Sequence, residues 1–161
     1  MAIAPLVEDY LSRHGATYDV VAHPRSHTSS GTAQAAHVPG DRLVKCVVLE
    51  DDDGMLLAVL PSTLSVHIGQ LSGQTQRRLR LADERDLQGL FPDCSLGAIP
   101  PLGPAYGVRI ILDDSLEAQQ ELYFEAGDHE HLVHMTAKQF MALVGPAQRV
   151  HFGVAERRAL R

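Results

Sequence analysis

The sequence predicts a mixed α+β fold. Apolar runs of strand length are preceded and followed by segments with helical spacing. Two of the runs form a β-hairpin, which argues against a purely parallel sheet. The 161 residues are 45% apolar and 21% charged, as in an ordinary folded protein. We therefore expect one domain over residues 1–161 that buries about two thirds of its unfolded surface and needs no metal or disulfide to fold.

The N-terminal part predicts a helix, a strand and a second helix. Apolar residues at helical spacing indicate the first helix at 5–14, and a short strand follows at 17–22. A polar segment rich in Ser and Thr comes next. Its Ser29 or Ser30 can cap a short helix that runs through Ala36.

The next segment predicts a hairpin of two buried strands. Residues 43–49 form a nearly continuous apolar run, rich in valine and interrupted only by Lys45, and 55–60 form a second run. The Asp-Gly turn between them is typical of a tight hairpin. Alternation along the strand places Lys45 on the same face as Leu43 and Val47, so its amine does not join an exposed charged face.

The remaining elements follow from the same criteria. Residues 63–90 are predicted to be mostly helical, with Asp83 as a helix cap and a short strand near 79–82, and four prolines make 92–107 irregular. We expect strands at 108–112, 121–124 and 132–135, a last helix at 136–144 opened by a Thr-x-x-Gln capping box, and a loosely held tail from Gln148.

The charge of the chain limits its partners. A net charge of −6 and a pI of about 5.8 argue against a positively charged surface that grips long nucleic acid, but they are compatible with contact at one nucleic-acid end. The chain contains no apolar run long enough for a membrane span, no secretion signal and no C-x-x-C pair. We expect a cytoplasmic protein with neither a membrane nor DNA as partner.

Lys45 is one of only two lysines, the other being Lys138. Burial of an ammonium group in an apolar strand is costly unless the group is paired or faces a cleft. In one interpretation the side chain lies at a sheet edge and its amine reaches water. In the other, the amine serves a ligand cavity, where its charge meets a phosphate or a developing oxyanion. Lys45 alone leaves both interpretations open.

A second candidate is the G-x-x-x-P segment Gly97-Ala98-Ile99-Pro100-Pro101. Glycine adopts backbone angles that other residues avoid, and the prolines fix the chain that follows. Such a loop can present backbone N–H groups to a bound carbonyl and shape a pocket. An ordinary surface loop is the alternative.

A third candidate is Gly127-Asp128-His129, followed by His131 and His134. A histidine at this strand junction could orient a water molecule or bond to a substrate. Three nearby histidines also raise the question of zinc. Strand alternation separates His134 from the other two, however, and no further Cys/His set completes a site. We expect no metal and no cofactor.

The segment from His23 to Thr32, whose hydroxyl groups include those of Thr28, Ser29 and Ser30, is a fourth candidate, either as the lining of a polar pocket or as helix and turn caps. Cys46 faces away from Lys45, Cys94 has no motif partner, and no Ser-His-Asp motif is recognisable. A nucleophilic thiol or serine is therefore not indicated.

In their order along the chain, these features resemble the YbaK / prolyl-tRNA synthetase associated domain family. Its members are free-standing relatives of the editing domain inserted in bacterial prolyl-tRNA synthetase. The matching segments, which cover nearly the whole chain, are His23-Pro24 with the Ser/Thr segment, Val44-Lys45-Cys46-Val47-Val48-Leu49, Gly97 to Pro101, Asp113, Gly127-Asp128-His129 and the closing helix. The resemblance implies a largely antiparallel, curved sheet flanked by helices.

The resemblance also implies an activity, namely hydrolysis in trans of the ester that joins a wrong amino acid to the 3′ end of a tRNA. Lys45 matches the family's functional lysine and would engage the tRNA terminus near its phosphate. The loop from Gly97 to Pro101 would hold the ester and position water, and His129 would lie at the pocket rim. Members lack a covalent nucleophile and a metal, and a hydroxyl of the terminal ribose helps to activate the water.

The expected partners are the aminoacylated acceptor end of a tRNA and an aminoacyl-tRNA synthetase that supplies tRNA affinity. Subfamilies act on alanine, cysteine, or serine and threonine. His27 and the hydroxyls of 28–30 favour a small polar amino acid. Some relatives carry asparagine where this chain has Cys46, so no role is carried over to that residue.

Two other functions stay open. The first is a non-catalytic module of the same fold that binds a tRNA end or a partner protein. The second is a Schiff-base enzyme with Lys45 as its nucleophile, which requires an amine with a lowered pKa in an apolar pocket.

Overall fold

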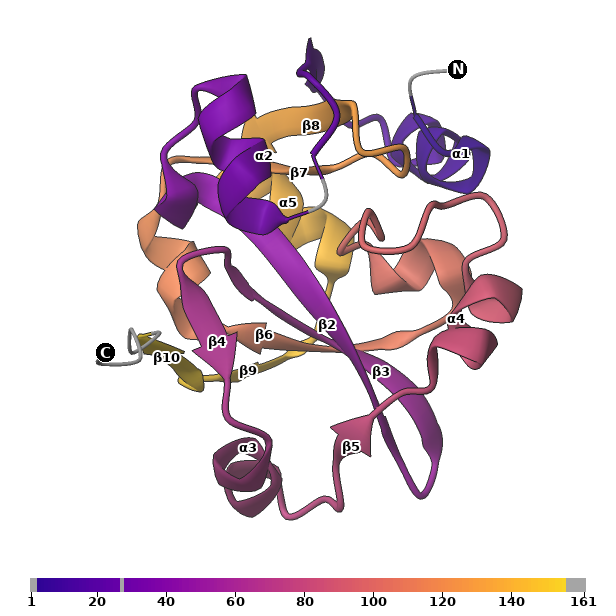
Figure 1. Cartoon of the computed structure of the whole chain (residues 1–161), viewed down its shortest axis with the longest axis vertical. Helices are drawn as coiled ribbons and strands as arrows, with labels where there is room; N and C mark the ends of the chain where they lie inside the picture. The colour runs from indigo at the N-terminus through magenta and orange to yellow at the C-terminus, as the bar shows by residue number, and fades with distance from the viewer. Residues whose placement is uncertain (1–2, 27, 156–161) are drawn as a thin grey trace.

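The computed structural model describes residues 3–26 and 28–155 and contains a mixed sheet with helices on both faces (Figure 1). The strands are β1 (Asp19–Ala22), β2 (Leu43–Asp51), β3 (Gly54–Pro61), β4 (Leu64–Val66), β5 (Arg80–Leu81), β6 (Arg109–Asp113), β7 (Glu121–Glu125), β8 (His131–Thr136), β9 (Gln148–Val150) and β10 (Gly153–Ala155). The α-helices are α1 (Pro5–Arg13), α2 (Ser29–Ala36), α3 (Ile68–Thr75), α4 (Glu84–Leu90) and α5 (Ala137–Val144).

The main sheet has eight strands in the order β1-β8-β7-β2-β3-β6-β9, with β5 paired to the end of β2. Within the described residues, four of its pairings are antiparallel and three are parallel. Strands β4 and β10 form a separate pair. The predicted α+β class, with a mixed and largely antiparallel sheet flanked by helices, is confirmed.

The hairpin of β2 and β3 crosses the centre of the molecule and provides side chains to both faces of the sheet (Figure 1). Val44 and Val48 belong to the largest core cluster, which also contains residues of α1 and α5. Leu49 packs in a second cluster with Leu71 of α3, and Leu43 packs against α2. The predicted alternation of β2 therefore separates two differently packed faces.

Two predictions for the connecting segments are wrong. Residues 63–90 are less helical than expected, because β4 interrupts them and pairs with β10. The predicted short strand near 79–82 is present as β5, which pairs with β2. The tail is not loosely held as far as Ala155. The fully buried Asp113 carboxylate accepts hydrogen bonds from the backbone N–H groups of Phe152 (2.9 Å) and Gly153 (2.7 Å), and the Phe152 ring is buried.

Several helix boundaries agree with their sequence signals. Helix α5 begins at the predicted capping box, where the Thr136 hydroxyl accepts a hydrogen bond from the Gln139 N–H. Asp83 caps α4 as expected. In the part of the chain that the structure describes, every helix is too short or too polar to cross a membrane.

The main sheet is split on one side of β2. Strands β2 and β7 share only two residue pairs, the second of which joins Val44 to Phe124. The same edge of β2 next pairs with β5, at Leu49. Among the described residues, 45–48 thus have no strand beside them on this edge, and the surrounding loops and helices enclose a space there.

The turn of the β2–β3 hairpin is held by a buried ion pair. The Asp51 side chain is only 4% exposed and accepts hydrogen bonds from Arg109 Nη1 (3.0 Å) and Nη2 (2.8 Å) and from Arg77 Nη1 (3.1 Å). The hydrogen bond from Arg109, the largest cause, holds the pKa of Asp51 well below its ordinary value.

We expect Asp51→Asn to lower the free energy of unfolding by about 3 kcal/mol at pH 7, because two arginines lose their buried counter-charge. Since the folded-state pKa is depressed, this stabilisation is complete above the unfolded pKa of about 3.9 and is lost as the pH falls below it. Urea denaturation of both proteins from pH 7 to pH 3 measures the difference. A difference that stays constant below pH 4 would contradict this account.

Candidate functional site

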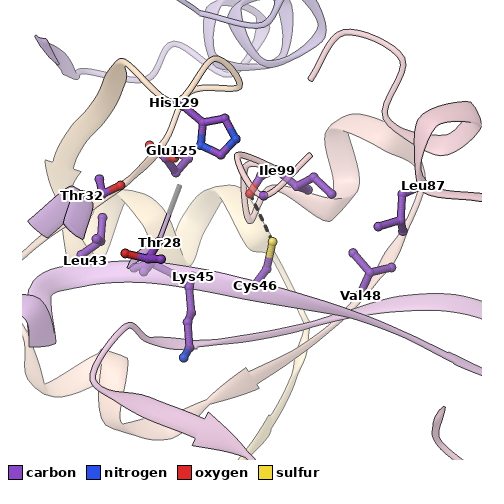
Figure 2. A pocket seen from close by; sticks show the side chains of 12 residues that line it. Thr28, Thr32, Leu43, Lys45, Cys46, Val48, Leu87, Ile99, Glu125 and His129 are labelled. Carbon is purple, nitrogen blue, oxygen red and sulfur yellow. Dashed lines mark hydrogen bonds and ion pairs between the residues drawn. The ribbon is translucent and has the colours of Figure 1, made fainter. Parts of the chain in front are cut away.

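The split between β2 and β7 contains a cavity of about 180 Å³. This is smaller than the ~300–1,000 Å³ typical of pockets for drug-sized ligands, so the cavity suits a small group. The cavity is lined by Thr28, Thr32, Leu43, Val44, Lys45, Cys46, Val48, Leu87, Gly97, Ile99, Glu125 and His129. Figure 2 labels ten of these residues. Five of the residues predicted from the sequence therefore meet at one place: Thr28, Lys45, Gly97, Ile99 and His129.

The G-x-x-x-P loop closes one side of the cavity and is tied to both sides of the split. At its start, the Ser95 N–H donates to the Gly127 carbonyl (2.8 Å) in the turn between β7 and β8. Further along, the Cys46 thiol on β2 donates to the Ile99 carbonyl (3.2 Å), as Figure 2 shows. The loop thus bridges the two strands that no longer pair with each other.

His129 fixes the position of this loop. Its Nε2 bonds to the Leu96 carbonyl, and its ring lies so close to Gly97 that a Cβ at this glycine would be 3.1 Å from His129 Cε1. Both residues adopt left-handed backbone angles, with φ of +83° at Gly97 and +65° at His129. Such an angle costs a non-glycine residue ~1–3 kcal/mol, and it persists at His129 because the surrounding contacts hold the ring.

The loop has backbone donors at residues that line the cavity. Gly97 and Ile99 both line it, and their N–H groups form no hydrogen bond among the described residues. Unpaired N–H groups held by a rigid loop are suited to an oxyanion that develops during acyl transfer.

Lys45 lies in the cavity wall, but its amine is directed elsewhere. Cys46 packs toward the large core and Val47 toward the second one, so successive side chains of β2 alternate as predicted. Figure 2 shows the Lys45 side chain leaving β2 on the side opposite Cys46 and pointing away from Glu125 and His129. This direction disfavours a Schiff-base role for Lys45 inside the cavity.

The two thiols are poor nucleophiles. Burial is the main reason that the pKa of Cys46 and the pKa of Cys94 are both raised to about 12. Because the thiolate is the reactive form, both cysteines stay protonated and unreactive near neutral pH. The sequence-based argument against a thiol nucleophile agrees with these environments.

Glu125 was missed by the sequence analysis. It is the last residue of β7, its side chain is 13% exposed, and burial raises its pKa to about 7. The available signal was a carboxylate at the end of an apolar strand, directly before the Gly-Asp-His segment. Thr32, the last residue of the predicted segment from His23 to Thr32, follows Thr28 by one helical turn and lines the same cavity.

The other predicted site residues lie outside the cavity wall. Pro100 and Pro101 are buried at the end of the loop, and the Gly127 carbonyl accepts the Ser95 hydrogen bond. Asp128 turns toward His131, whose Nδ1 lies 2.6 Å from Oδ2 of the carboxylate. The remaining predicted residues are not placed by the structure: the Ser29 and Ser30 side chains and all of His27 lie outside what it describes.

The histidines after Asp128 do not assemble around one point. His131 bonds to Asp128, whereas His134 stacks on Tyr123 and lies 3.1 Å from Glu121. Within the described residues, the one group arranged closely enough to hold a metal ion is Asp113, Asp114 and His151, none of which lines the cavity.

The sequence pattern of the aminoacyl-tRNA editing domain matches residues 23–143, which include the cavity wall. The chain belongs to the aminoacyl-tRNA editing domain family. This membership supports a role in aminoacyl-tRNA editing and confirms the family resemblance found in the sequence. No curated protein sequence matches the chain.

Solved structures agree with this assignment. One, described as a "putative trans-editing enzyme for prolyl tRNA synthetase", is 25% identical with a TM-score of 0.81, over 93% of this chain and 96% of that one. A scaffold protein used for epitope grafting is 22% identical with a TM-score of 0.81, over 95% and 97% of the two chains. A hypothetical protein is 19% identical with a TM-score of 0.78, over 89% and 97%. The last two likenesses concern the fold alone.

We expect Gly97→Ala to lower the free energy of unfolding by about 1–3 kcal/mol, because the new Cβ meets the His129 ring and φ is left-handed. Gly73→Ala is the matched control. Its Cβ would meet no atom within 4 Å inside helix α3, so it should leave stability unchanged or raise it by about 0.5–1 kcal/mol. Denaturant unfolding compares the three proteins, and equal stability of Gly97→Ala and the wild type would refute the close packing described here.

Proposed function

We propose that the chain is an aminoacyl-tRNA deacylase that acts in trans and hydrolyses the ester of a mischarged tRNA. The observation that carries the proposal is that Gly97 and Ile99, whose N–H groups make no hydrogen bond among the described residues, line a small cavity together with Lys45. The cavity is sized for an aminoacyl group, and its two threonines favour a small amino acid such as serine, threonine, alanine or cysteine.

In the proposed reaction, water attacks the ester carbonyl and a hydroxyl of the terminal ribose helps to activate the water. The carbonyl oxygen becomes an oxyanion, to which the N–H groups of Gly97 and Ile99 donate. When the intermediate collapses, the bond to the ribose oxygen breaks and that oxygen takes up a proton. The products are the free amino acid and the uncharged tRNA.

Three further residues have roles in this proposal. Lys45 provides a fixed cation for the terminal phosphate, outside the space that holds the amino acid. His129 holds the loop through Leu96, and Pro101 fixes the end of the loop. The buried thiols and the direction of the Lys45 amine support hydrolysis by water over a covalent intermediate.

The proposal has a physical rationale in substrate discrimination. Synthetases distinguish small amino acids poorly, because one methylene group changes binding by only about 1–3 kcal/mol. A separate cavity of limited volume can accept a small wrong product and exclude a larger correct one. The acidic net charge is compatible with this role when only the acceptor end is bound, or when a synthetase supplies the remaining tRNA affinity.

We expect the purified protein to release the amino acid from at least one of alanyl-, cysteinyl-, seryl- and threonyl-tRNA. Lys45→Ala should lower kcat/KM by about 100-fold, since a charged hydrogen bond contributes ~1.5–3 kcal/mol. Lys45→Arg should retain part of the activity because it keeps the positive charge.

Lys138→Ala is the matched control, because Lys138 is the other lysine of the chain and is exposed on α5. It should deacylate at the wild-type rate. If all four charged tRNAs stay intact with the wild-type protein, the chain is not a deacylase of these substrates. Binding of tRNA without turnover would then favour a non-catalytic module.

A further inference from the structure

Glu125 is the acidic side chain among the residues that line the cavity. Its carboxylate lies between two histidines. Oε1 is 3.5 Å from His23 Nε2, and Oε2 is 3.5 Å from His129 Nδ1. The His23 side chain is fully buried and the His129 side chain is 5% exposed, so bulk water does not solvate this group from either side.

The other nitrogen of each histidine is engaged by a backbone carbonyl. His23 Nδ1 lies 2.8 Å from the Pro24 carbonyl, and His129 Nε2 bonds to the Leu96 carbonyl. A carbonyl oxygen can only accept, so these ring nitrogens carry the protons. In the neutral rings, the nitrogens that face Glu125 therefore carry lone pairs and can only accept hydrogen bonds.

One oxygen of the carboxylate thus lacks a hydrogen-bond donor among the described residues. Glu125 Oε1 and His23 Nε2 are both buried and make no hydrogen bond among the described residues. Burial, with a smaller effect of the Asp128 charge, raises the pKa of Glu125 to about 7. A buried charge without donors is costly, and a ligand that brings a positively charged N–H group offsets this cost.

We propose that Glu125 binds the α-ammonium group of the aminoacyl ester and so selects substrates with a free amine. The inference rests on the proposed deacylase function and adds the recognition of the amino acid to it. The two ends of the substrate are then held by opposite charges, since Lys45 serves the phosphate and Glu125 the ammonium group. An ammonium group supplies three donors to this side of the cavity, where Glu125 and the neutral rings of His23 and His129 offer acceptors.

The test compares esters that differ only at this group. Alanyl-tRNA and lactyl-tRNA have acyl groups of nearly equal size, and the second carries a hydroxyl in place of the ammonium group. Seryl- and glyceryl-tRNA form a second pair. We expect the wild-type protein, after correction for the spontaneous hydrolysis of each ester, to prefer the aminoacyl form by about 10- to 100-fold in kcat/KM.

Glu125→Gln should lose most of this preference, because it slows the aminoacyl ester and leaves the hydroxyacyl ester within about twofold of the wild type. Glu130→Gln is the matched control, since Glu130 is an exposed carboxylate five residues away that pairs with Arg25. It should keep the wild-type preference. The proposal is overturned if Glu125→Gln slows both esters equally, which would indicate a role in proton transfer, or if the wild-type protein does not distinguish them.

Binding separates this inference from the proposed function. The probes are 3′-alanylamino-3′-deoxyadenosine, whose amide resists hydrolysis, and its lactyl counterpart. A preference of the wild-type protein for the first probe, lost in Glu125→Gln, supports ammonium recognition even if no tRNA is deacylated. Equal affinity for the two probes overturns the inference and leaves a measured deacylase activity unaffected.

Stability provides a readout that does not depend on any ligand. Because the pKa of Glu125 is raised in the folded state, ionisation of the carboxyl destabilises the fold as the pH rises through about 7. Glu125→Gln should therefore have a higher Tm than the wild type at pH 8, and this difference should shrink at pH 5. A lower Tm of the variant at pH 8 would mean that the ionised carboxylate is satisfied within the fold, which contradicts the proposal.

Discussion

The limited pairing between β2 and β7 is the constraint on which the site depends. Two residue pairs join the strands, and beyond Val44 and Phe124 the edge of β2 lacks a neighbouring strand until β5. A closed sheet would fill this space with backbone hydrogen bonds. Here the G-x-x-x-P loop bridges the split instead, held by Cys46 on one side and by the β7–β8 turn on the other. The cavity is therefore a consequence of sheet topology and needs no movement to form.

The charges around the split are arranged asymmetrically. Lys45 leaves β2 away from the cavity interior, whereas Glu125 lines the cavity beside His129 (Figure 2). A ligand with a phosphate at one end and an ammonium group at the other matches this separation, and the aminoacylated end of a tRNA has both. The overall acidic charge of the chain does not oppose such local binding, because the proposed function involves only one nucleic-acid end.

The sequence predicted those parts of the site that are encoded by local pattern. The valine-rich run fixed the strand of Lys45, and glycine followed by prolines indicated the loop at Gly97. Helical and strand periodicity do not indicate which strands pair along their whole length, so the gap between β2 and β7 was not predictable. Glu125 had only a weak local signal, a carboxylate at the end of an apolar strand, because its environment comes from His23 and His129, and His23 is distant in sequence. The ordered tail was missed for the same reason, since Asp113 bonds to backbone groups about forty residues away.

The most direct test of this account is a crystal structure of the protein with 3′-alanylamino-3′-deoxyadenosine 5′-phosphate. The account predicts that the alanyl group lies in the cavity between β2 and β7, with its carbonyl oxygen near the Gly97 and Ile99 N–H groups and its phosphate near Lys45. Density for the alanyl group at any other place on the protein, or a cavity that stays without the ligand at saturating concentration, would contradict it.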